Sequence, residues 1–426
     1  MADAALPPLP PPPAPPAAAS GLLVGYSGGL DSTVLLHLLA SAPDRSRLPL
    51  RAIHVCHGLD PAAEAWVAHC EAACRALDVP LSVVRVQVDR DSGLGLEAAA
   101  REARHAAFAA TLRDGEILAL AHHADDQAET FLLRALRASG PDGLAAMRPW
   151  RAYARGWLWR PLLGHSRTAL LGHARARGLQ WIEDPSNTGN ALDRNYLRNE
   201  VMPLLRRRWR NADAAFSRSA ALCAEATALL GAEDAQVLAA ALASPDTLCA
   251  DGLATHPPAR RARILRRWCA ELGLPPLPGN GVDRIESGDG FEWAGARIRR
   301  WRDLLHAGPM RAPLPTQWTQ EWPGDGPLPL PGGGSLRLAG AARFDAPVRV
   351  HARQGGERIR LPGRDHSHEL KHVLQDLGVP PWLRERLPLL SDADGRVLAA
   401  GDRVASAAFD AWLRERGASL AWIPWD

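Results

Sequence analysis

The sequence predicts an α/β protein in three structured parts: a parallel-sheet domain, a helical middle domain and a small mixed α/β C-terminal domain. From Gly21 to about Gln180, short apolar runs alternate with amphipathic stretches, the pattern of a parallel sheet with helices on its faces. From Asn211 to about Leu305 the periodicity is mostly helical. A chain of 426 residues is too long for one ordinary domain, and its 46% hydrophobic content supports packed cores.

The first part contains four strand candidates, each followed by a helix candidate. The strand segments are apolar or β-branched, and the helix segments carry apolar residues at helical spacing. In chain order they are strand Gly21–Ser27, helix Thr33–Ala40, strand Arg51–Val55, helix Pro61–Leu77, strand Leu81–Val88, helix Leu96–Leu112, strand Glu116–Ala121 and helix Ala124–Ala138. Ligands of such sheets bind beyond the carboxyl ends of the strands. The candidate chemical segments there are Ser27–Ser32, His54–Leu59 and His122–Glu129.

Composition shifts suggest the domain boundaries. Residues 1–20 are rich in Ala and Pro, lack the basic start of a signal peptide, and are expected to form a disordered tail. The expected domains are then 21–210 for the parallel-sheet part, 211–307 for the helical part and 336–426 for the C-terminal part. Residues 308–335, rich in Pro and Gly, are expected to be a linker.

Charge and cysteine usage narrow the class of protein. The net charge is only +3, so bulk charge does not indicate a nucleic-acid partner. Lys371 is the only lysine among the 50 basic residues; the other 49 are Arg, which codon bias alone can explain. The six cysteines form no C-x-x-C pair, which argues against structural zinc, an iron–sulfur cluster or a disulfide framework and agrees with a reducing cytoplasm. No apolar run approaches the roughly 20 residues of a membrane span.

A phosphate-binding loop is predicted at Ser27, Gly28, Gly29, Leu30, Asp31 and Ser32, between an apolar strand and a helix. Glycines let backbone N–H groups approach an anion closely, and the following helix start adds positive potential. The two serines add hydroxyl donors, and Asp31 is expected to act through Mg²⁺ or as a helix cap. An ordinary glycine turn with a capped helix is the alternative. The pattern lacks G-x-x-x-x-G-K-[ST], so it is not the kinase-type P-loop.

The full S-G-G-x-D-S pattern resembles the PP-loop of the ATP pyrophosphatases, which have an adenine nucleotide alpha hydrolase-like fold. Members of that superfamily cleave ATP to AMP and diphosphate and form an adenylate on their substrate. The resemblance therefore implies ATP as the nucleotide, together with Mg²⁺.

A second motif lies at the expected end of the fourth strand, where His122 and His123 precede a helix that carries Asp126 and Glu129. Two carboxylates three residues apart share a helix face, where they can bind an ammonium group or act as a base. The alternative is helix-start acids that balance the dipole, worth about 0.3–1 kcal/mol each. The stretch resembles the signature of the tRNA(Ile)-lysidine synthase family.

Further segments resemble the same family over nearly the whole chain after the tail. Each segment contains a short pattern that is similar to one of the family, and the patterns follow in the same order along the chain. The segments are Arg134–Gly140, Gly143–Met147, Arg160–Leu163, Glu183–Asn187, Arg194–Arg198, Trp293–Arg302, Gly355–Ile359 and Gly378–Arg384. The resemblance implies that 211–307 is a substrate-binding domain and that 336–426 binds tRNA.

The implied reaction modifies cytidine 34 of a tRNA(Ile) with a CAU anticodon. ATP adenylates the C2 oxygen of the base, free L-lysine attacks C2 through its side-chain amine, and AMP leaves. The product, lysidine, pairs with adenosine, so the codon that the tRNA reads changes from AUG to AUA. The enzyme is expected in the cytoplasm, without membrane contact, as a possible homodimer.

Roles for individual residues follow as hypotheses. Asp126 and Glu129 are expected to hold the lysine ammonium and take its proton, and Arg101 or Arg104 to neutralise a phosphate or the lysine carboxylate. His122 and His123 are expected to position substrate or to shape the pocket. The residues expected to line the nucleotide or RNA side of the cleft are Asn187, Arg194, Asn195 and Arg198.

Outside the catalytic part, two arginine clusters are candidates for RNA contact. One comprises Arg260, Arg261, Arg263, Arg266 and Arg267, and the other Arg297, Arg299, Arg300 and Arg302. Such clusters suit a phosphate backbone, but a solvated helix face in an Arg-biased chain explains them equally well. Fourteen of the 15 tryptophans follow residue 149, and most are expected in cores or interfaces, with stacking on anticodon bases as the alternative.

Three competing functions remain open at this point. Another PP-loop tRNA-modifying enzyme, such as a tRNA thiolase, commonly needs cysteine pairs, which this chain lacks. A small-molecule synthetase using ammonia would not need more than about 200 residues of additional domains. A non-catalytic RNA-binding protein on a degenerate loop is disfavoured by the intact S-G-G-x-D-S motif and the acidic pair.

Overall fold

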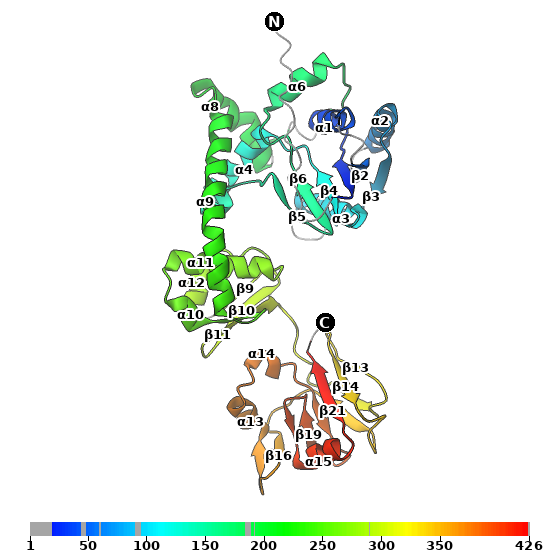
Figure 1. Cartoon of the computed structure of the whole chain (residues 1–426), viewed down its shortest axis with the longest axis vertical. Coiled ribbons are helices and arrows are strands. Elements are labelled where there is room, and N and C mark those ends of the chain that lie inside the picture. The colour runs from blue at the N-terminus through cyan, green and yellow to red at the C-terminus, as the bar shows by residue number, and fades with distance from the viewer. Residues whose placement is uncertain are drawn as a thin grey trace. The chain divides into compact units, whose positions relative to one another are not determined.

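The computed structural model describes residues 19–43, 48–58, 61–89, 95–183, 189–190, 192–288 and 290–424. The chain forms two compact units, Met1–Ala232 and Glu233–Asp426, whose elements are labelled in Figure 1. Among the described residues, no helix combines the length and the apolar character required to cross a bilayer.

The first unit is organised around a six-stranded sheet of order β3-β2-β1-β4-β6-β5. All neighbouring pairs are parallel except β5 with β6, which form an antiparallel hairpin. The strands are β1 (Gly21–Gly25), β2 (Leu50–Cys56), β3 (Leu81–Arg85), β4 (Glu116–Ala119), β5 (Trp150–Tyr153) and β6 (Gly156–Trp159). This confirms the predicted fold class.

Helices cover both faces of this sheet, because neighbouring residues of a strand point to opposite faces. In β1, Val24 packs with residues of α1, α2 and α6, whereas Leu23 packs on the other face with Phe108 and Leu112 at the end of α3. The helices that follow the first four strands are α1 (Leu30–Ala40), α2 (Ala63–Ala76), α3 (Leu96–Thr111) and α4 (Ala124–Leu136). Each predicted strand and helix up to Ala138 therefore has a counterpart.

The strand order reverses direction at β1. The chain runs from β1 outward to β2 and β3, and then returns to place β4 on the other side of β1. Connections that leave in opposite directions open a crevice at the carboxyl ends of the two central strands. The segments that follow β1 and β4 are the two sequence motifs, so both lie at this crevice.

The rest of the first unit is helical apart from the β5–β6 hairpin. Its π-helical turn η3 is continuous with α7 and α8, and such turns occur frequently at functional sites. The elements are α5 (Pro141–Leu144), α6 (Arg167–Ala176), α7 (Asp193–Tyr196), η3 (Leu197–Val201), α8 (Met202–Arg208) and the long helix α9 (Ala212–Ala241).

The second unit begins with helices on a five-stranded antiparallel sheet of order β7-β8-β11-β10-β9. Ile264, Leu265 and Trp268 of α11 are buried in its core together with Ile298 and Leu305 of the sheet. The elements are β7 (Leu242–Ser244), β8 (Thr247–Cys249), α10 (Ala250–Ala254), α11 (Pro258–Glu271), α12 (Gly279–Ser287), β9 (Phe291–Trp293), β10 (Ala296–Trp301) and β11 (Leu304–Pro309). The region expected to be mostly helical thus also contains a sheet.

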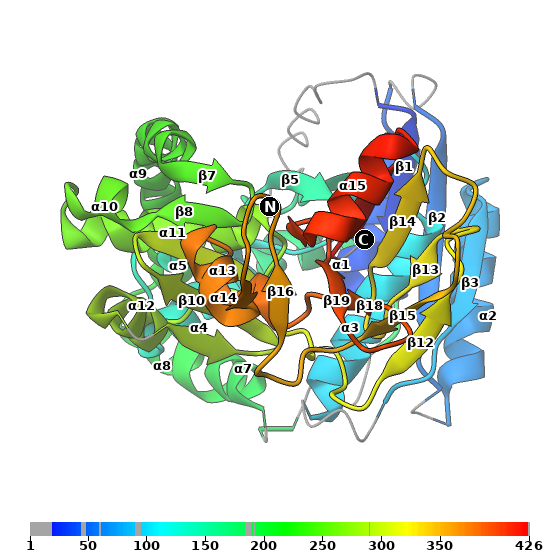
Figure 2. The same ribbon diagram turned by 90° about the horizontal axis from the view of Figure 1, so that it is seen from below.

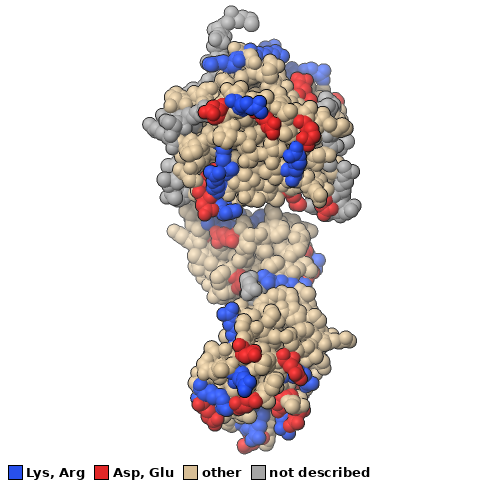
Figure 3. Space-filling view, turned by 90° about the vertical axis from the view of Figure 1, so that its right-hand side faces the viewer, with Lys and Arg blue, Asp and Glu red and all other residues tan. Residues whose placement is uncertain are grey.

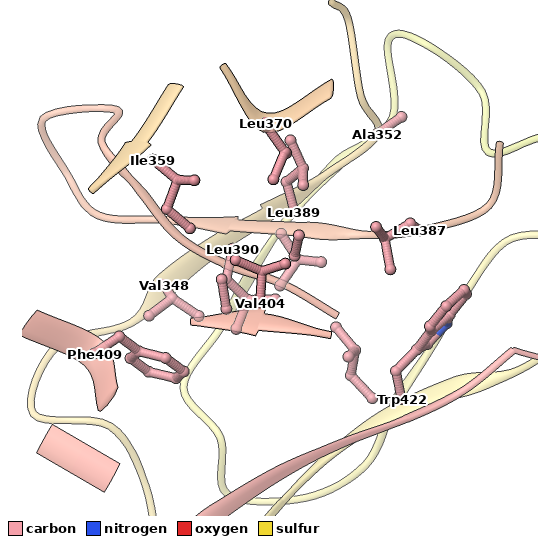
Figure 4. Packing of buried hydrophobic residues seen from close by; sticks show 14 of the residues in the cluster. Val348, Ala352, Ile359, Leu370, Leu387, Leu389, Leu390, Val404, Phe409 and Trp422 are labelled. Carbon is pink, nitrogen blue, oxygen red and sulfur yellow. The ribbon is translucent and has the colours of Figure 1, made fainter. Parts of the chain in front are cut away.

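The C-terminal part of this unit is a mixed α/β module. Figure 4 shows its core, in which Leu389 and Leu390 of β18 lie between Val348 and Phe409 on one side and Trp422 on the other. One sheet has the order β12-β15-β18-β19-β20, a second β13-β14-β21, and β16 pairs with β17. Helix α15 packs beside β19 (Figure 2).

The bounds of these last elements complete the fold. They are β12 (Thr319–Trp322), β13 (Leu328–Pro329), β14 (Ser335–Ala339), β15 (Val348–His351), β16 (Arg358–Arg360), β17 (Ser367–Glu369), α13 (Leu370–Asp376), α14 (Pro381–Arg384), β18 (Leu389–Ser391), β19 (Val397–Ala400), β20 (Val404–Ala405), α15 (Ala407–Glu415) and β21 (Ser419–Ile423). Part of the segment expected as a linker, including Leu314, Trp322 and Leu328, packs into this core.

Candidate active site

The loop between β1 and α1 is closed by its own serines. The Ser27 and Ser32 hydroxyl oxygens lie 3.0 Å apart, and the Ser32 hydroxyl donates a hydrogen bond to the Gly29 carbonyl oxygen, also at 3.0 Å. The backbone N–H of Gly29 points toward the Ser27 hydroxyl at 3.4 Å. Helix α1 begins at Leu30, so its first N–H groups, which have no partner within the helix, open onto this loop. The arrangement suits an anion such as a phosphate.

Gly28 is the position in the loop that requires glycine. Its φ of +84° lies in the left-handed region, and a Cβ there would approach Ile182 Cδ1 to 2.7 Å and Cys70 Sγ to 3.0 Å. Ile182 also donates its N–H to the Gly28 carbonyl oxygen at 2.8 Å and forms an isolated parallel bridge with Gly29. The loop is thus held in place by its contacts with Ile182, which is far away in sequence.

The acidic pair lies on the buried face of α4 and is engaged by two guanidinium groups. Arg194 donates to Glu129 Oε2 at 2.8 Å and to Asp126 Oδ1 at 2.9 Å. Arg198 donates to Glu129 Oε1 at 2.7 Å and to the same Asp126 oxygen at 2.9 Å. Glu129 is 1% exposed. Although burial raises the pKa of Asp126, the charges of His123 and Arg194 outweigh it and hold that pKa below its ordinary value.

Arg194 and Arg198 reach the pair from adjacent turns. Arg194 lies on α7 and Arg198 on the π-helical turn η3, four residues further on. Although burial lowers the pKa of Arg198, its hydrogen bond to Glu129 and the charge of that carboxylate raise it. These two arginines, expected on the nucleotide or RNA side of the cleft, therefore form one charge network with the acids expected to bind lysine.

His123 joins the phosphate loop to α4. Its Nε2 lies 3.6 Å from Asp31 Oδ2 of the loop and 3.4 Å from Asp126 Oδ2, and its Nδ1 lies 3.7 Å from Asp125 Oδ1. Burial lowers the pKa of His123, but the hydrogen bond with Asp31 and the nearby carboxylates raise it above the ordinary value overall. The surrounding carboxylates thus stabilise the charged form of His123 more than water does for an ordinary histidine.

His122, the neighbouring residue, lies in the opposite electrostatic environment. Burial lowers its pKa to about 3, and the charges of Arg160, Arg194 and Arg101 add to that effect. Arg160 donates its Nε–H to His122 Nδ1 at 3.2 Å. His122 is therefore neutral near pH 7.

A group of arginines without carboxylate partners lies beside the acidic pair. Arg101 and Arg104 of α3, Arg151 of β5 and Arg160 form no ion pair with any residue in the described part of the chain. Burial and one another's charges lower the pKa of Arg101, Arg104 and Arg160, the last to about 10. Uncompensated positive charge of this kind is suited to an anionic substrate group.

The remaining expected residues are less informative. His54, on β2, is buried and its Nδ1 lies 3.0 Å from the Tyr26 carbonyl oxygen, a structural contact. Asn195 is half-buried on α7. Leu59 and Asn187 lie outside the described residues, so their expected positions at the cleft stay predictions.

The loop also contains an acceptor suited to a cation. Asp31 Oδ1 is a buried oxygen with no hydrogen-bond partner among the described residues. Mg²⁺ binds through one or two carboxylates together with substrate phosphates, so a single such oxygen beside a phosphate loop fits it. No group of three or more His, Cys, Asp or Glu side chains able to hold a metal occurs within the described ranges.

The arginine clusters of the second unit are largely neutralised. Arg260 pairs with Glu233 at 2.5 Å, Arg261 with Glu286 at 2.9 Å, and Arg299 with Glu385 at 2.8 Å. On the face seen in Figure 3, basic and acidic side chains are interspersed. Because most of these arginines are paired with acids, the two clusters are better explained as a solvated, ion-paired surface than as a dedicated RNA site.

Sequence reasoning missed three contributors to the site. Ile182 carries no chemical signal, and only its contact with Gly28 reveals its role. Asp125 was passed over beside Asp126, yet it lies near His123 and pairs with Arg206 at 3.0 Å. Arg160 was considered only as part of a segment that resembles the family. Its position directly after a strand indicates a place at the carboxyl edge of the sheet.

Comparisons with known proteins cover most of the chain. Family profiles match at residues 11–205 (PP-loop domain), 248–306 (TilS substrate binding domain) and 348–422 (TilS substrate C-terminal domain). The tRNA(Ile)-lysidine synthase of Xanthomonas campestris pv. campestris (strain 8004) is 55% identical over 412 residues, covering 94% of each chain. That of Xylella fastidiosa (strain Temecula1 / ATCC 700964) is 52% identical over 415 residues, with the same coverage. Among solved structures, the U34-tRNA thiolase NcsA from Methanococcus maripaludis is 16% identical, with a TM-score of 0.40 over 47% of this chain and 70% of that chain.

The two neighbouring loop glycines give a first prediction. We expect Gly28→Ala to lower the free energy of unfolding by about 1–3 kcal/mol, because it combines a left-handed backbone with close contact to Ile182 and Cys70. Gly29→Ala is the matched control: the nearest side-chain atom to its Cβ is Ser27 Oγ at 3.5 Å, so stability should change by less than about 0.5 kcal/mol. Urea unfolding of both variants measures this, and equal losses would contradict it.

The buried charge network gives a second prediction. Arg198→Met should destabilise the protein by about 3–5 kcal/mol near neutral pH, because it leaves buried carboxylates short of a partner. A carboxyl group with a lowered folded pKa stabilises above its unfolded pKa of about 4 and loses that contribution as pH falls through the folded value. The difference between Arg198→Met and the parent should therefore shrink below about pH 4.

Arg137→Met provides the control for that measurement. Arg137 and Asp193 lie 3.7 Å apart with side chains 73% and 79% exposed, so breaking this pair should cost less than about 1 kcal/mol. Denaturant unfolding at several pH values compares the two variants. If Arg198→Met lowers the free energy of unfolding no more than Arg137→Met does, the charge network is not buried in solution.

Proposed function

Because the chain belongs to the tRNA(Ile)-lysidine synthase family, we propose that it attaches free L-lysine to C2 of cytidine 34 in the CAU anticodon of a tRNA(Ile). In this reaction ATP first adenylates the C2 oxygen, and the lysine side-chain amine then displaces AMP. The modified base pairs with adenosine in place of guanosine. The family membership sets aside the alternative of a tRNA thiolase.

One observation supports this reaction most directly. The phosphate loop after β1 and the acidic helix α4 after β4 are neighbours across the crevice, and His123 contacts Asp31 of the first and Asp126 of the second. ATP cleavage and amine attack at one base require these two functions within reach of the same atom. A phosphate loop alone would explain only ATP binding.

The loop residues take the ATP phosphates in this proposal. The Gly29 N–H, the Ser27 and Ser32 hydroxyls and the first N–H groups of α1 are donors, and phosphate oxygens accept from them. The Ser32 hydroxyl donates to the Gly29 carbonyl oxygen, and the Ser27 hydroxyl lies 3.0 Å from Ser32 Oγ, so each can turn toward a phosphate by a small rotation. Asp31 would hold Mg²⁺, which neutralises phosphate charge when bound.

Asp126 and Glu129 bind the lysine ammonium in this proposal. Both carboxylates accept hydrogen bonds from Arg194 and Arg198, and two carboxylates with two guanidinium groups have no net charge. An arriving ammonium competes with a guanidinium for these oxygens. The carboxylates then accept the proton that the amine must lose before it can attack.

The unpaired arginines take the anionic groups of the substrates. Arg101 and Arg104 lie on one face of α3, three residues apart, where a carboxylate or a phosphodiester can be bound by both. Arg151 and Arg160 extend the same positive area along the sheet edge. We assign Arg101 and Arg104 to the lysine carboxylate and Arg151 to the RNA side.

The assay that tests the proposal uses a tRNA(Ile) with a CAU anticodon, ATP and radiolabelled lysine. We expect label to enter the RNA with release of one AMP and one diphosphate for each lysine. A tRNA in which cytidine 34 is replaced by uridine is the control and should stay unlabelled. No label in the cognate tRNA, or equal label in the control, would contradict the proposal.

Isosteric variants of the acidic pair separate the two halves of the reaction. Glu129→Gln and Asp126→Asn should lower lysine transfer by about 100-fold or more, because they remove the charge that binds the ammonium and accepts its proton. Diphosphate release should continue, since the phosphate loop is untouched. Asp193→Asn, an exposed carboxylate beside Arg194, is the matched control and should transfer lysine normally. Transfer at the parental rate by Glu129→Gln would disprove the assignment.

A further inference from the structure

The contact between Arg160 and His122 restricts what His122 can do. Arg160 follows β6, is 7% exposed, and donates its Nε–H to His122 Nδ1 at 3.2 Å. Its Nη1 donates to the Arg148 carbonyl oxygen at 2.7 Å, which fixes the guanidinium in place. The histidine thus faces a buried, anchored group that has donors only.

The direction of this hydrogen bond determines the tautomer of His122. A guanidinium has five N–H donors and no acceptor, so Nδ1 must be the nitrogen that carries the lone pair. A neutral imidazole carries one proton, which then resides on Nε2. A protonated imidazole would bring two N–H groups face to face and is excluded by the same contact.

We propose that Arg160 is a positioning residue that fixes His122 as the neutral Nε2–H tautomer, so that His122 donates a hydrogen bond to a substrate oxygen and cannot take the lysine proton. The proposal rests on the function proposed above and adds a role for the first of the paired histidines. The oxygen we assign to this donor is O2 of the target cytosine, the atom that becomes adenylated and later leaves with AMP.

The charged groups around His122 agree with this state. Asp126 of α4 favours its protonation, whereas Arg160, Arg194 of α7 and Arg101 of α3 oppose it, and burial opposes it most strongly. No hydrogen bond to Nε2 is formed by any other residue in the described ranges. Nε2 is therefore available to a ligand that enters among these residues.

The two adjacent histidines then have different roles. His123 lies among Asp31, Asp125 and Asp126, which raise its pKa, and it links the loop to the acidic helix. His122 is neutral and offers one donor. When the lysine nitrogen bonds to C2, the C2–O bond breaks with its electron pair on the departing AMP. The amine proton goes to a carboxylate of the acidic pair, and the His122 proton stays on Nε2.

The direct test is nitrogen NMR on the full-length protein labelled with nitrogen-15 in histidine. His122 is assigned by the loss of its signals in His122→Gln. We expect a lone-pair-type shift for Nδ1 and a protonated-type shift for Nε2, both constant from pH 6 to pH 8. In Arg160→Met the Nδ1 signal should move toward the protonated type. Arg134→Met, which removes another half-buried arginine bound to backbone carbonyls, should leave both signals unchanged.

Kinetics with His122 variants test the donor role in proteins that keep Arg160. The amide nitrogen of Gln takes the place of Nε2 and that of Asn the place of Nδ1, so His122→Gln keeps the donor and His122→Asn loses it. His122→Asn should lower the single-turnover rate of AMP transfer to tRNA about 100-fold with little change in the KM for ATP. His122→Gln should stay within about tenfold of the parent.

The outcomes separate this inference from the proposed function. A proton on Nδ1 in the unaltered protein, equal rates for His122→Asn and His122→Gln, or unchanged His122 signals in Arg160→Met would each overturn it. Absence of lysidine formation by the unaltered protein would refute the proposed function, while the NMR result would still decide the tautomer.

Discussion

The parallel pairing of β1 with β4 is the constraint on which the rest of the site depends. It places two segments that are about 90 residues apart in sequence at one edge of the sheet, because parallel strands share their carboxyl ends. The phosphate loop after β1 and the acidic helix after β4 then face the same crevice, and His123 connects them through Asp31 and Asp126. A different strand order would leave each motif intact and neither in contact with the other.

Charge balance divides this crevice into two areas of different net charge. Asp126 and Glu129 are neutralised by Arg194 and Arg198, so this side is stable before any ligand binds. The arginines from α3 to the residue after β6 form no ion pair within the described part of the chain and retain net positive charge. In the proposed reaction the lysine ammonium is assigned to the first area, and the anionic groups of lysine and RNA to the second. The pKa values of the paired histidines shift in opposite directions, because His122 is buried beside a guanidinium and His123 faces carboxylates.

Sequence alone predicted the elements of the first unit and both motifs, since periodicity and local patterns determine them. Helix α1 begins at Leu30, earlier than expected, because the phosphate loop itself forms its first turn. The strands of the middle part were not predicted. In β10 the buried residues Ala296 and Ile298 alternate with arginines, which is the two-residue period of a strand, but the region as a whole was expected to be helical. The partners of Asp126 and Glu129, and the contact of Ile182 with Gly28, depend on long-range packing, which no local pattern contains.

The central claim is that the loop and the acidic helix serve one reaction through an adenylate on the RNA. The most direct measurement follows ATP labelled with radioactive phosphorus in its α-phosphate, mixed with the enzyme and a CAU-anticodon tRNA(Ile) in the absence of lysine. The account predicts that label becomes bound to the RNA and is released as AMP, one for each lysine incorporated, when lysine is added. RNA that never carries the label, or AMP released without lysine incorporation, would contradict it.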